Sequence, residues 1–220
     1  MLKVCIGRMK MANHVHFSVN FHQINDAAKD KLKELFGRIR EDGNYRWFSD
    51  IFVEGDLTYE ETEKYAWTTE NIGPKWCYFE DYDAEGEPYF NGEAAWSAPE
   101  EGLVKLLEIL EEYDPNIITS MTYEDEMPNF VGVYVYDGSE CYDGFEDEWE
   151  ELRDRVISVS ETLTEESWNE DEEEWADEDA EDTFREEMWE VIGDSQWDLI
   201  HECVEQLKAD QAERENTVGC

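Results

Sequence analysis

Residues 14–22, HVHFSVNFH, alternate between polar and apolar side chains along their whole length. Successive side chains of a β-strand point to opposite faces, so Val15, Phe17, Val19 and Phe21 share one face. The opposite face carries three histidines, a serine and an asparagine. The stretch therefore predicts a strand with one face on a hydrophobic core, around which the neighbouring segments must pack.

The segment after this strand predicts an amphipathic helix. Asn25 and Asp26 are favourable N-cap residues, and residues 26–40 place five apolar side chains on one helical face. Residues 46–53 then predict a second strand, with aromatic and β-branched side chains at its two ends. A short helix is expected at residues 59–67.

Residues 89–96 predict a further strand, followed by a helix with Ser97 as its N-cap and Glu100 in a capping box. Two strands, at residues 117–124 and 130–136, complete the pattern. The order of elements contains two β-α-β units. Such units form ferredoxin-like sheets with both helices on one face, so the sequence predicts an α+β fold.

The character of the chain changes after residue 142. Spacings of three and four between apolar residues predict an amphipathic helix over residues 149–163. Residues 165–182, EESWNEDEEEWADEDAED, hold twelve acidic residues in eighteen. A later helical pattern is interrupted by Gly-Asp at 193–194, and Ser195 is expected to cap a last helix. About three acidic helices are therefore expected.

Three regions follow from these patterns: an N-terminal extension at residues 1–10, a ferredoxin-like domain at 11–142 and an acidic helical region at 143–220. With 40% hydrophobic residues, the 220-residue chain has enough apolar side chains to bury a core.

The charge balance limits the classes of partner. The chain has 59 Asp and Glu against 17 Lys and Arg, a formal net charge of -42. Binding to phosphates requires clusters of Lys and Arg, so direct binding to nucleic acid is excluded and binding to anionic membranes is disfavoured. A basic protein surface is the expected partner. A halophilic origin and a need for solubility are alternative explanations of the acidity.

The five cysteines include no C-x-x-C pair, and their number is odd, which favours free thiols in a reducing cytoplasm. No apolar run approaches the roughly 18 residues of a membrane span, and residues 1–10 do not have the apolar core of a signal peptide. A cytoplasmic location is therefore expected.

Four short stretches occur together in a recognisable order. They are Met11-Ala12-Asn13-His14, Gly73-Pro74-Lys75-Trp76, Ala95-Trp96-Ser97-Ala98-Pro99, and Tyr123 followed by Phe130-Val131-Gly132. Over about residues 11–136 the chain resembles the YubB-type ferredoxin-like domain of uncharacterised phage and plasmid proteins. The resemblance implies a fold and a mobile-element origin, and it implies no catalytic residues.

The residues offer two enzymatic alternatives, a metal site and a cysteine nucleophile. His14, His16 and His22 share one face of the first strand, and histidines two residues apart can ligate zinc together with a carboxylate. The same spacing also fits polar residues on an exposed strand face. Acidic neighbours disfavour a thiolate nucleophile at Cys77 or Cys141. We expect no metal, no cofactor and no catalysis.

The acidic run offers the most specific functional hypothesis. Trp168 and Trp175 are seven residues apart and share a face if the run is helical, where they either anchor a partner or pack on the protein itself. The predicted partner-binding residues are Trp168, Glu170, Asp171, Glu172, Glu173, Glu174, Trp175, Asp177, Glu178 and Asp179.

The sequence thus predicts a non-catalytic DNA mimic or inhibitor, of phage or mobile-element origin, that occupies the basic nucleic-acid-binding surface of a host protein. A metal-dependent enzyme using the first-strand histidines is one alternative. A scaffold protein with a solubilising acidic segment is another. The oligomeric state stays open.

Overall fold

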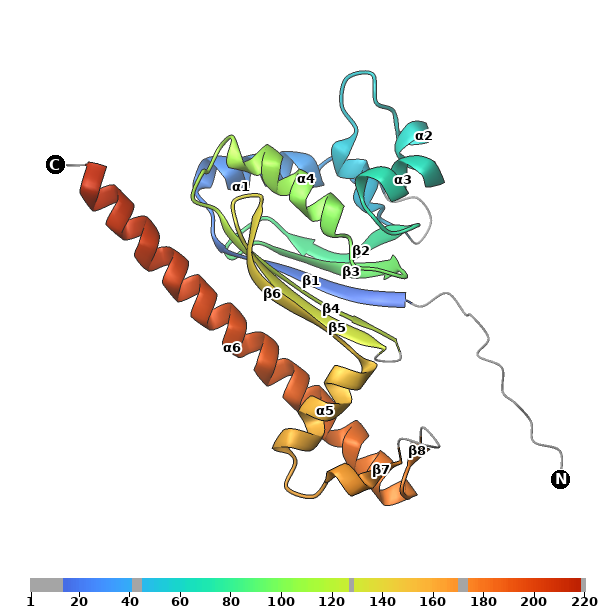
Figure 1. The fold of residues 1–220 in the computed structure, drawn as a ribbon. Helices are drawn as coiled ribbons and strands as arrows, with labels where there is room; N and C mark the ends of the chain where they lie inside the picture. Colours follow the sequence, from blue (N-terminus) through green and yellow to red (C-terminus); the bar gives the residue numbers. More distant parts are fainter. Residues whose placement is uncertain (1–13, 41–44, 127–128, 170–173, 219–220) are drawn as a thin grey trace.

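The computed structural model describes residues 14–40, 45–126, 129–169 and 174–218. It has a mixed α+β architecture, in which helices lie on both sides of a six-stranded antiparallel sheet (Figure 1). The sheet strands are β1 (His14–Gln23), β2 (Cys77–Asp83), β3 (Tyr89–Ala95), β4 (Ile118–Asp125), β5 (Phe130–Asp137) and β6 (Glu140–Glu148). A separate hairpin pairs β7 (Trp168–Asn169) with β8 (Glu174–Trp175).

The helices are α1 (Asp26–Phe36), α2 (Tyr59–Thr62), α3 (Tyr65–Asn71), α4 (Glu100–Glu111), α5 (Trp149–Val159) and α6 (Glu178–Val218), with short 3-10 helices η1 (Phe48–Phe52) and η2 (Glu165–Ser167). The predicted N-terminal extension at residues 1–10 lies outside the described residues. Strand β6 spans the expected boundary between residues 142 and 143, so the sheet continues into the acidic region.

The strand order is β2-β3-β1-β4-β5-β6. Strand β1 lies inside the sheet, where Val15 pairs with Ala94 of β3 on one side and Asp125 of β4 on the other. Its four apolar side chains are all buried. This arrangement places the polar side chains of β1, including its three histidines, on the opposite face of the sheet.

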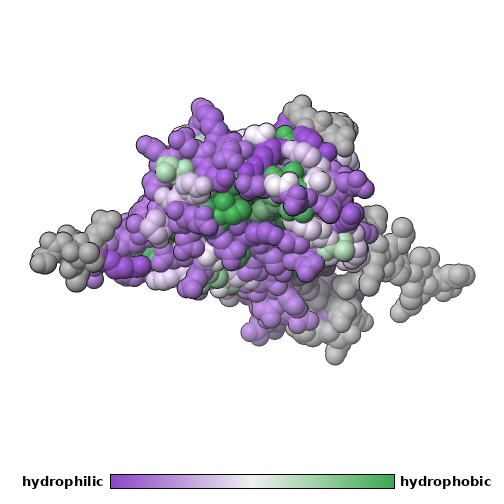
Figure 2. Space-filling model, turned by 90° about the horizontal axis from the view of Figure 1, so that it is seen from above, coloured by the Kyte–Doolittle hydropathy of each residue, from purple (hydrophilic) through white to green (hydrophobic). Residues whose placement is uncertain are grey.

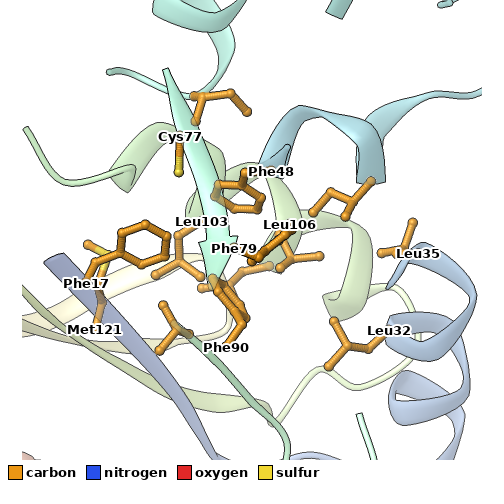
Figure 3. Close-up of a cluster of buried hydrophobic side chains, with 14 of the residues drawn as sticks. Phe17, Leu32, Leu35, Phe48, Cys77, Phe79, Phe90, Leu103, Leu106 and Met121 are labelled. Atoms are coloured by element: carbon orange, nitrogen blue, oxygen red, sulfur yellow. The ribbon is translucent and has the colours of Figure 1, made fainter. Parts of the chain in front are cut away.

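The larger core lies between the sheet and the layer of α1, α4 and η1. Figure 3 shows Phe17 of β1, Phe79 of β2 and Phe90 of β3 meeting Leu103 and Leu106 of α4 and Phe48 of η1. Seen from the side of these helices, the surface is mostly hydrophilic with a small hydrophobic hollow near its centre (Figure 2). The aromatic content of the sequence is therefore largely used for internal packing.

The opposite face of the sheet is covered in part by α6. Cys203, Val204 and Leu207 of α6 pack on Ile118 of β4 and Val135 of β5. A second cluster joins the N-terminal half of α6 to α5 through Phe184, Met188, Leu152 and Val156, among others. The long helix thus joins the acidic segment to the sheet (Figure 1).

The prediction of a strand at residues 46–53 was wrong. Residues 48–52 form η1, and all five are buried, with Phe48, Ile51 and Phe52 in the larger core. Buried apolar residues at positions 48, 51 and 52 fit a helical spacing better than an alternating one. The segment before η1 instead lies beside β2, which begins about 30 residues later. Trp47 forms a β-bridge with Tyr78, and Arg46 O accepts a hydrogen bond from the Phe79 amide at 2.8 Å.

Two helix boundaries were tested by the capping geometry. Asn25 is the N-cap of α1, as predicted, and its side chain accepts a hydrogen bond from the Ala28 amide at 2.9 Å. The prediction for Ser97 was wrong, because α4 begins at Glu100 with Pro99 at the N-cap position. Trp96 has a φ of 79°, so the chain makes a left-handed turn between β3 and α4.

The acidic region differs from the expected three helices. Residues 140–148 form the edge strand β6, which was not predicted, because acidic side chains conceal its pattern. The tryptophans of the acidic run pair in a hairpin and do not share a helix. The predicted break at 193–194 is absent: α6 continues through it, and Ser195 is an interior residue.

Candidate protein-binding surface

The carboxylates are concentrated in the C-terminal part of the chain. Residues 140–218 hold 31 of the 59 Asp and Glu and only five of the 17 Lys and Arg. Helix α6 has 41 residues, of which 14 are acidic and three basic. At about 1.5 Å per residue the helix is about 60 Å long. It therefore carries roughly one carboxylate per 4 Å, close to the phosphate spacing of about 3.4 Å along one DNA strand.

Trp168 and Trp175 lie opposite each other in the β7–β8 hairpin, with ring centroids 5.2 Å apart. Trp175 also packs on Phe184 of α6 at 4.7 Å, and Trp149 of α5 lies 5.2 Å from the same phenylalanine. The Arg153 guanidinium lies 5.0 Å from the Trp168 ring centroid. Both hairpin tryptophans are half-buried. The hairpin tryptophans therefore pack on the protein itself, which is one of the two roles expected for them; the other was to anchor a partner.

The predicted carboxylates of this region fall into two groups. Glu170, Asp171, Glu172 and Glu173 lie outside the described residues. Glu174, Asp177, Glu178 and Asp179 are all exposed.

Three of the exposed carboxylates also stabilise the start of α6. Asp177 Oδ1 accepts a hydrogen bond from the Ala180 amide at 2.9 Å and so caps the helix. Glu178 and Asp179 are in the first turn, where negative charge complements the helix dipole. These three carboxylates therefore have a structural role whether or not they meet a partner.

A different part of α6 combines exposed aromatic and acidic residues. We call it the outer face of α6, and it consists of Asp182, Glu186, Trp189, Glu190, Asp194 and Trp197. Spacings of three and four keep these residues within one side of the helix. Trp189 is 46% exposed and Trp197 is 66% exposed. Aromatic residues such as tryptophan are enriched at protein–protein interfaces relative to the rest of the surface.

Sequence reasoning did not identify this surface. The sequence places Trp197 on the predicted last helix at helical spacing with Ile200, Val204 and Leu207, which does not show whether Trp197 is exposed. The structure directs it outward, with its ring centroid 6.2 Å from that of His201. The sequence does contain a signal for this surface: Trp189 and Trp197 are eight residues apart amid acidic residues. The two share one side of a helix only if the helix continues through Gly193, which the sequence did not predict.

A groove of about 820 Å³ lies beside Trp197, between α6 and the uncovered part of the sheet. Its walls include one acidic side chain, Glu87, and one basic side chain, Lys208. Apolar side chains, among them Phe21 and Ile200, also line it. A protein that docks on the outer face of α6 therefore has an adjacent depression into which a side chain can extend.

The first-strand histidines do not act as one group. His14 Nδ1 lies 2.9 Å and His16 Nδ1 3.7 Å from the Glu93 carboxylate on β3. His22 is separate, with its Nε2 2.8 Å from Ser120 Oγ. Within the described ranges, no three or more His, Cys, Asp and Glu side chains are grouped so that they could hold a metal ion.

Three cysteines lie in the described part of the chain, and all are free. Burial raises the pKa of Cys77 well above its usual value. Burial also raises the pKa of Cys141, with a further contribution from the carboxylates of Glu100 and Asp143. A raised pKa keeps a thiol protonated and weakens it as a nucleophile.

Comparison of the chain with known protein families, with curated proteins and with solved structures gave no match. No helix in the described ranges has both the length and the apolar character needed to cross a bilayer. Any statement of function therefore depends on the surface itself.

Proposed function

We propose that this chain is a non-catalytic binding protein that acts as a DNA mimic or inhibitor. Its partner is the basic, nucleic-acid-binding surface of a host protein in the cytoplasm. The observation that carries the proposal is the outer face of α6, where Trp189 and Trp197 remain exposed between carboxylates. This surface replaces the hairpin tryptophans, which are used in internal packing, as the aromatic part of the binding site.

Binding takes place in two steps in this proposal. The concentrated negative charge first attracts a basic surface over a distance of about one Debye length, about 8 Å at physiological salt. The exposed indole rings then pack on the partner and interact with its arginine side chains through cation–π contacts. Carboxylates on the same face pair with the remaining basic groups, which fixes the orientation.

We also propose that the first part of the chain is a ferredoxin-like unit. The strand order β2-β3-β1-β4, with α1 and α4 on one face, supports a ferredoxin-like unit extended by β5 and β6. The resemblance to the YubB-type domain, and with it the phage or mobile-element origin, stays a prediction.

The proposal is tested by affinity capture from a bacterial lysate with the immobilised full chain. We expect retained proteins to be nucleic-acid-binding proteins that duplex DNA displaces. We also expect them to dissociate as salt rises from about 50 to about 300 mM, because contacts between basic groups and phosphates weaken over about the same range. Retention that is indifferent to both DNA and salt would contradict the proposal.

Two matched charge variants identify the surface. The first, Glu186→Gln with Glu190→Gln and Asp194→Asn, neutralises three carboxylates of the outer face of α6, and it should lose the retained proteins. The control, Asp56→Asn with Glu60→Gln and Glu70→Gln, removes the same charge from exposed positions near α2 and α3. Equal loss in both variants would show that net charge, and not the α6 surface, is recognised.

A further inference from the structure

An aromatic cavity lies on the face of the sheet that carries α6, in the part that the helix leaves uncovered. About 250 Å³ in volume, it is lined by five aromatic rings from three separate parts of the chain. They are His14 of β1, Tyr45 and Trp47 of the segment before η1, and Trp76 and Tyr78 at the start of β2. The tertiary fold alone brings these residues together.

The rings contact one another around Tyr78. Its ring centroid lies 5.6 Å from that of Trp76, which is stacked on it, and 5.1 Å from that of Tyr45, which meets it edge-on. Trp47 lies 5.4 Å from Tyr45, and His14 lies 5.1 Å from Trp76. Each ring is therefore held by at least one neighbour, so the walls of the cavity are formed before any ligand arrives.

A carboxylate lies behind these rings. Glu93 of β3 pairs with Tyr78 and His16 across the sheet, and its side chain is only 16% exposed. It accepts hydrogen bonds from the Tyr78 hydroxyl and from His14 Nδ1. Burial by itself raises the pKa of Glu93, but the hydrogen bonds from Tyr78 and His14, together with the charges of His16 and His14, outweigh burial and lower it. The carboxylate is therefore ionised at neutral pH.

We propose that this cavity binds a quaternary ammonium group, as found in choline or in a trimethylated lysine side chain. The electron-rich faces of aromatic rings attract cations, and a box of such rings fits the methyl groups that surround a quaternary nitrogen. The ionised Glu93 adds a full negative charge close to the bound cation. The proposal is independent of the acidic surface of α6.

Aromatic rings on an exposed sheet also stack with nucleic acid bases, which is the main competing use. That use requires Lys or Arg along the backbone of the nucleic acid. Here the charge hydrogen-bonded to the rings is the Glu93 carboxylate, and the chain has a net charge of -42. Arg46 and Lys75 flank the rings in sequence, but they lie against the rings of Tyr82 and Tyr65, which are outside the cavity. The electrostatics favour a cation and oppose a phosphate.

The test uses choline and its neutral carbon analogue 3,3-dimethyl-1-butanol, each titrated into the full chain and followed through the ligand methyl signals by NMR. We expect saturable binding of choline that is at least about tenfold tighter than binding of the neutral analogue, because only choline carries the charge. Equal binding of the two compounds would overturn the proposal, as would no binding of choline.

Variants assign the binding to this cavity. Glu93→Gln keeps the shape of the side chain and should weaken choline binding at least about tenfold, as should Trp76→Ala. Tyr113→Ala, which alters an exposed aromatic residue just after α4, should leave choline binding unchanged. The near-ultraviolet circular dichroism of Glu93→Gln should match that of the parent chain, which distinguishes a lost contact from a lost fold. Unchanged affinity in Glu93→Gln and Trp76→Ala would place the site elsewhere and contradict the assignment.

A peptide arm distinguishes the source of the ammonium group. A short peptide with one trimethyl-lysine and the same peptide with unmodified lysine are compared with free choline. Tighter binding of the trimethylated peptide than of choline indicates a protein ligand, and the reverse order indicates a small molecule or lipid headgroup. Failure of the choline test leaves the DNA-mimic proposal intact, because that test does not involve the outer face of α6.

Discussion

At the scale of single residues, the tryptophans of the acidic region fall into two classes. Trp168 and Trp175 form an internal cluster with Trp149 and Phe184, whereas Trp197 extends into water. An exposed indole contributes little to folding, because it loses little contact with water when the chain folds. The first class therefore supports the fold, and Trp197 is free to meet a partner.

This division predicts opposite outcomes for two alanine variants. Trp175→Ala should lower the free energy of unfolding by about 2 kcal/mol, below the roughly 3–5 kcal/mol of a fully buried aromatic residue. Trp197→Ala should change it by less than about 0.5 kcal/mol and should weaken partner retention. Urea unfolding followed by far-ultraviolet circular dichroism measures both. Equal destabilisation by the two substitutions would contradict the assigned roles.

At the scale of elements, α6 packs against two different surfaces. Phe184 is buried against the cluster on α5, and Val204 is buried against the sheet. They are 20 residues apart, and at about 100° per residue they point to nearly opposite sides of the helix. The apolar stripe thus changes phase along α6, which makes one continuous helix resemble two helices in the sequence.

Gly193 is an exposed residue of α6 between the cluster on α5 and the cluster on the sheet, and it predicts a stabilising substitution. A Cβ added at Gly193 meets nothing within 4 Å, and alanine favours a helix over glycine by about 1 kcal/mol. Gly193→Ala should therefore raise the free energy of unfolding by about 0.5–1 kcal/mol. Chemical denaturation provides the measurement.

The matched control is Gly102→Ala in α4. A Cβ there approaches both Ile72 and Phe48 at 3.0 Å, so the substitution overpacks the core. It should lower stability by about 1–3 kcal/mol in spite of its better helix propensity. A destabilising Gly193→Ala would indicate that α6 is interrupted at this position in solution.

At the scale of the whole molecule, like charges oppose the compact state. Burial raises the pKa of Glu100, Glu124 and Asp125. The charge of His16 partly offsets this for Glu124, and hydrogen bonds from Asn129 partly offset it for Asp125. The folded state thus holds these protons at a higher pH than the unfolded chain does. Protonation of the carboxyl groups therefore favours folding.

The sign of the pH dependence follows from linkage. Just above the ordinary Glu pKa of 4.5 the folded state binds more protons than the unfolded state, so stability should rise as pH falls from 7 towards 5. Glu93 does not oppose this trend, because its lowered pKa removes stability only below 4.5. Urea midpoints at constant ionic strength measure the trend.

His22 acts in the opposite direction. Burial, together with the charge of Lys208, lowers its pKa, so the unfolded chain takes up a proton below about pH 6.5 before the folded chain does. Glu124→Gln should therefore flatten the rise in stability towards acid pH, and His22→Gln should steepen it. A midpoint that falls steadily from pH 7 to 5 would show that the carboxyl groups do not dominate.

The sequence by itself determined the elements whose burial is periodic. Strand β1, helix α1 with its Asn25 cap, and strands β3, β4 and β5 were predicted close to their observed ranges. Each has one face on a core, and a face that is buried regularly leaves a period that can be read locally. The negative charge and its limits on the class of partner are likewise properties of composition.

The tertiary structure alone decided the rest. Strand β6 is an edge strand covered with carboxylates, so it has no local apolar period. Which of residues 48–52 and residues 77–83 forms the strand beside β3 was decided by the pairing of β2 with β3. The aromatic cavity joins residues 14, 45, 47, 76 and 78. Contacts between distant segments depend on how sheets pair and helices cross, and local side-chain periodicity does not record that information.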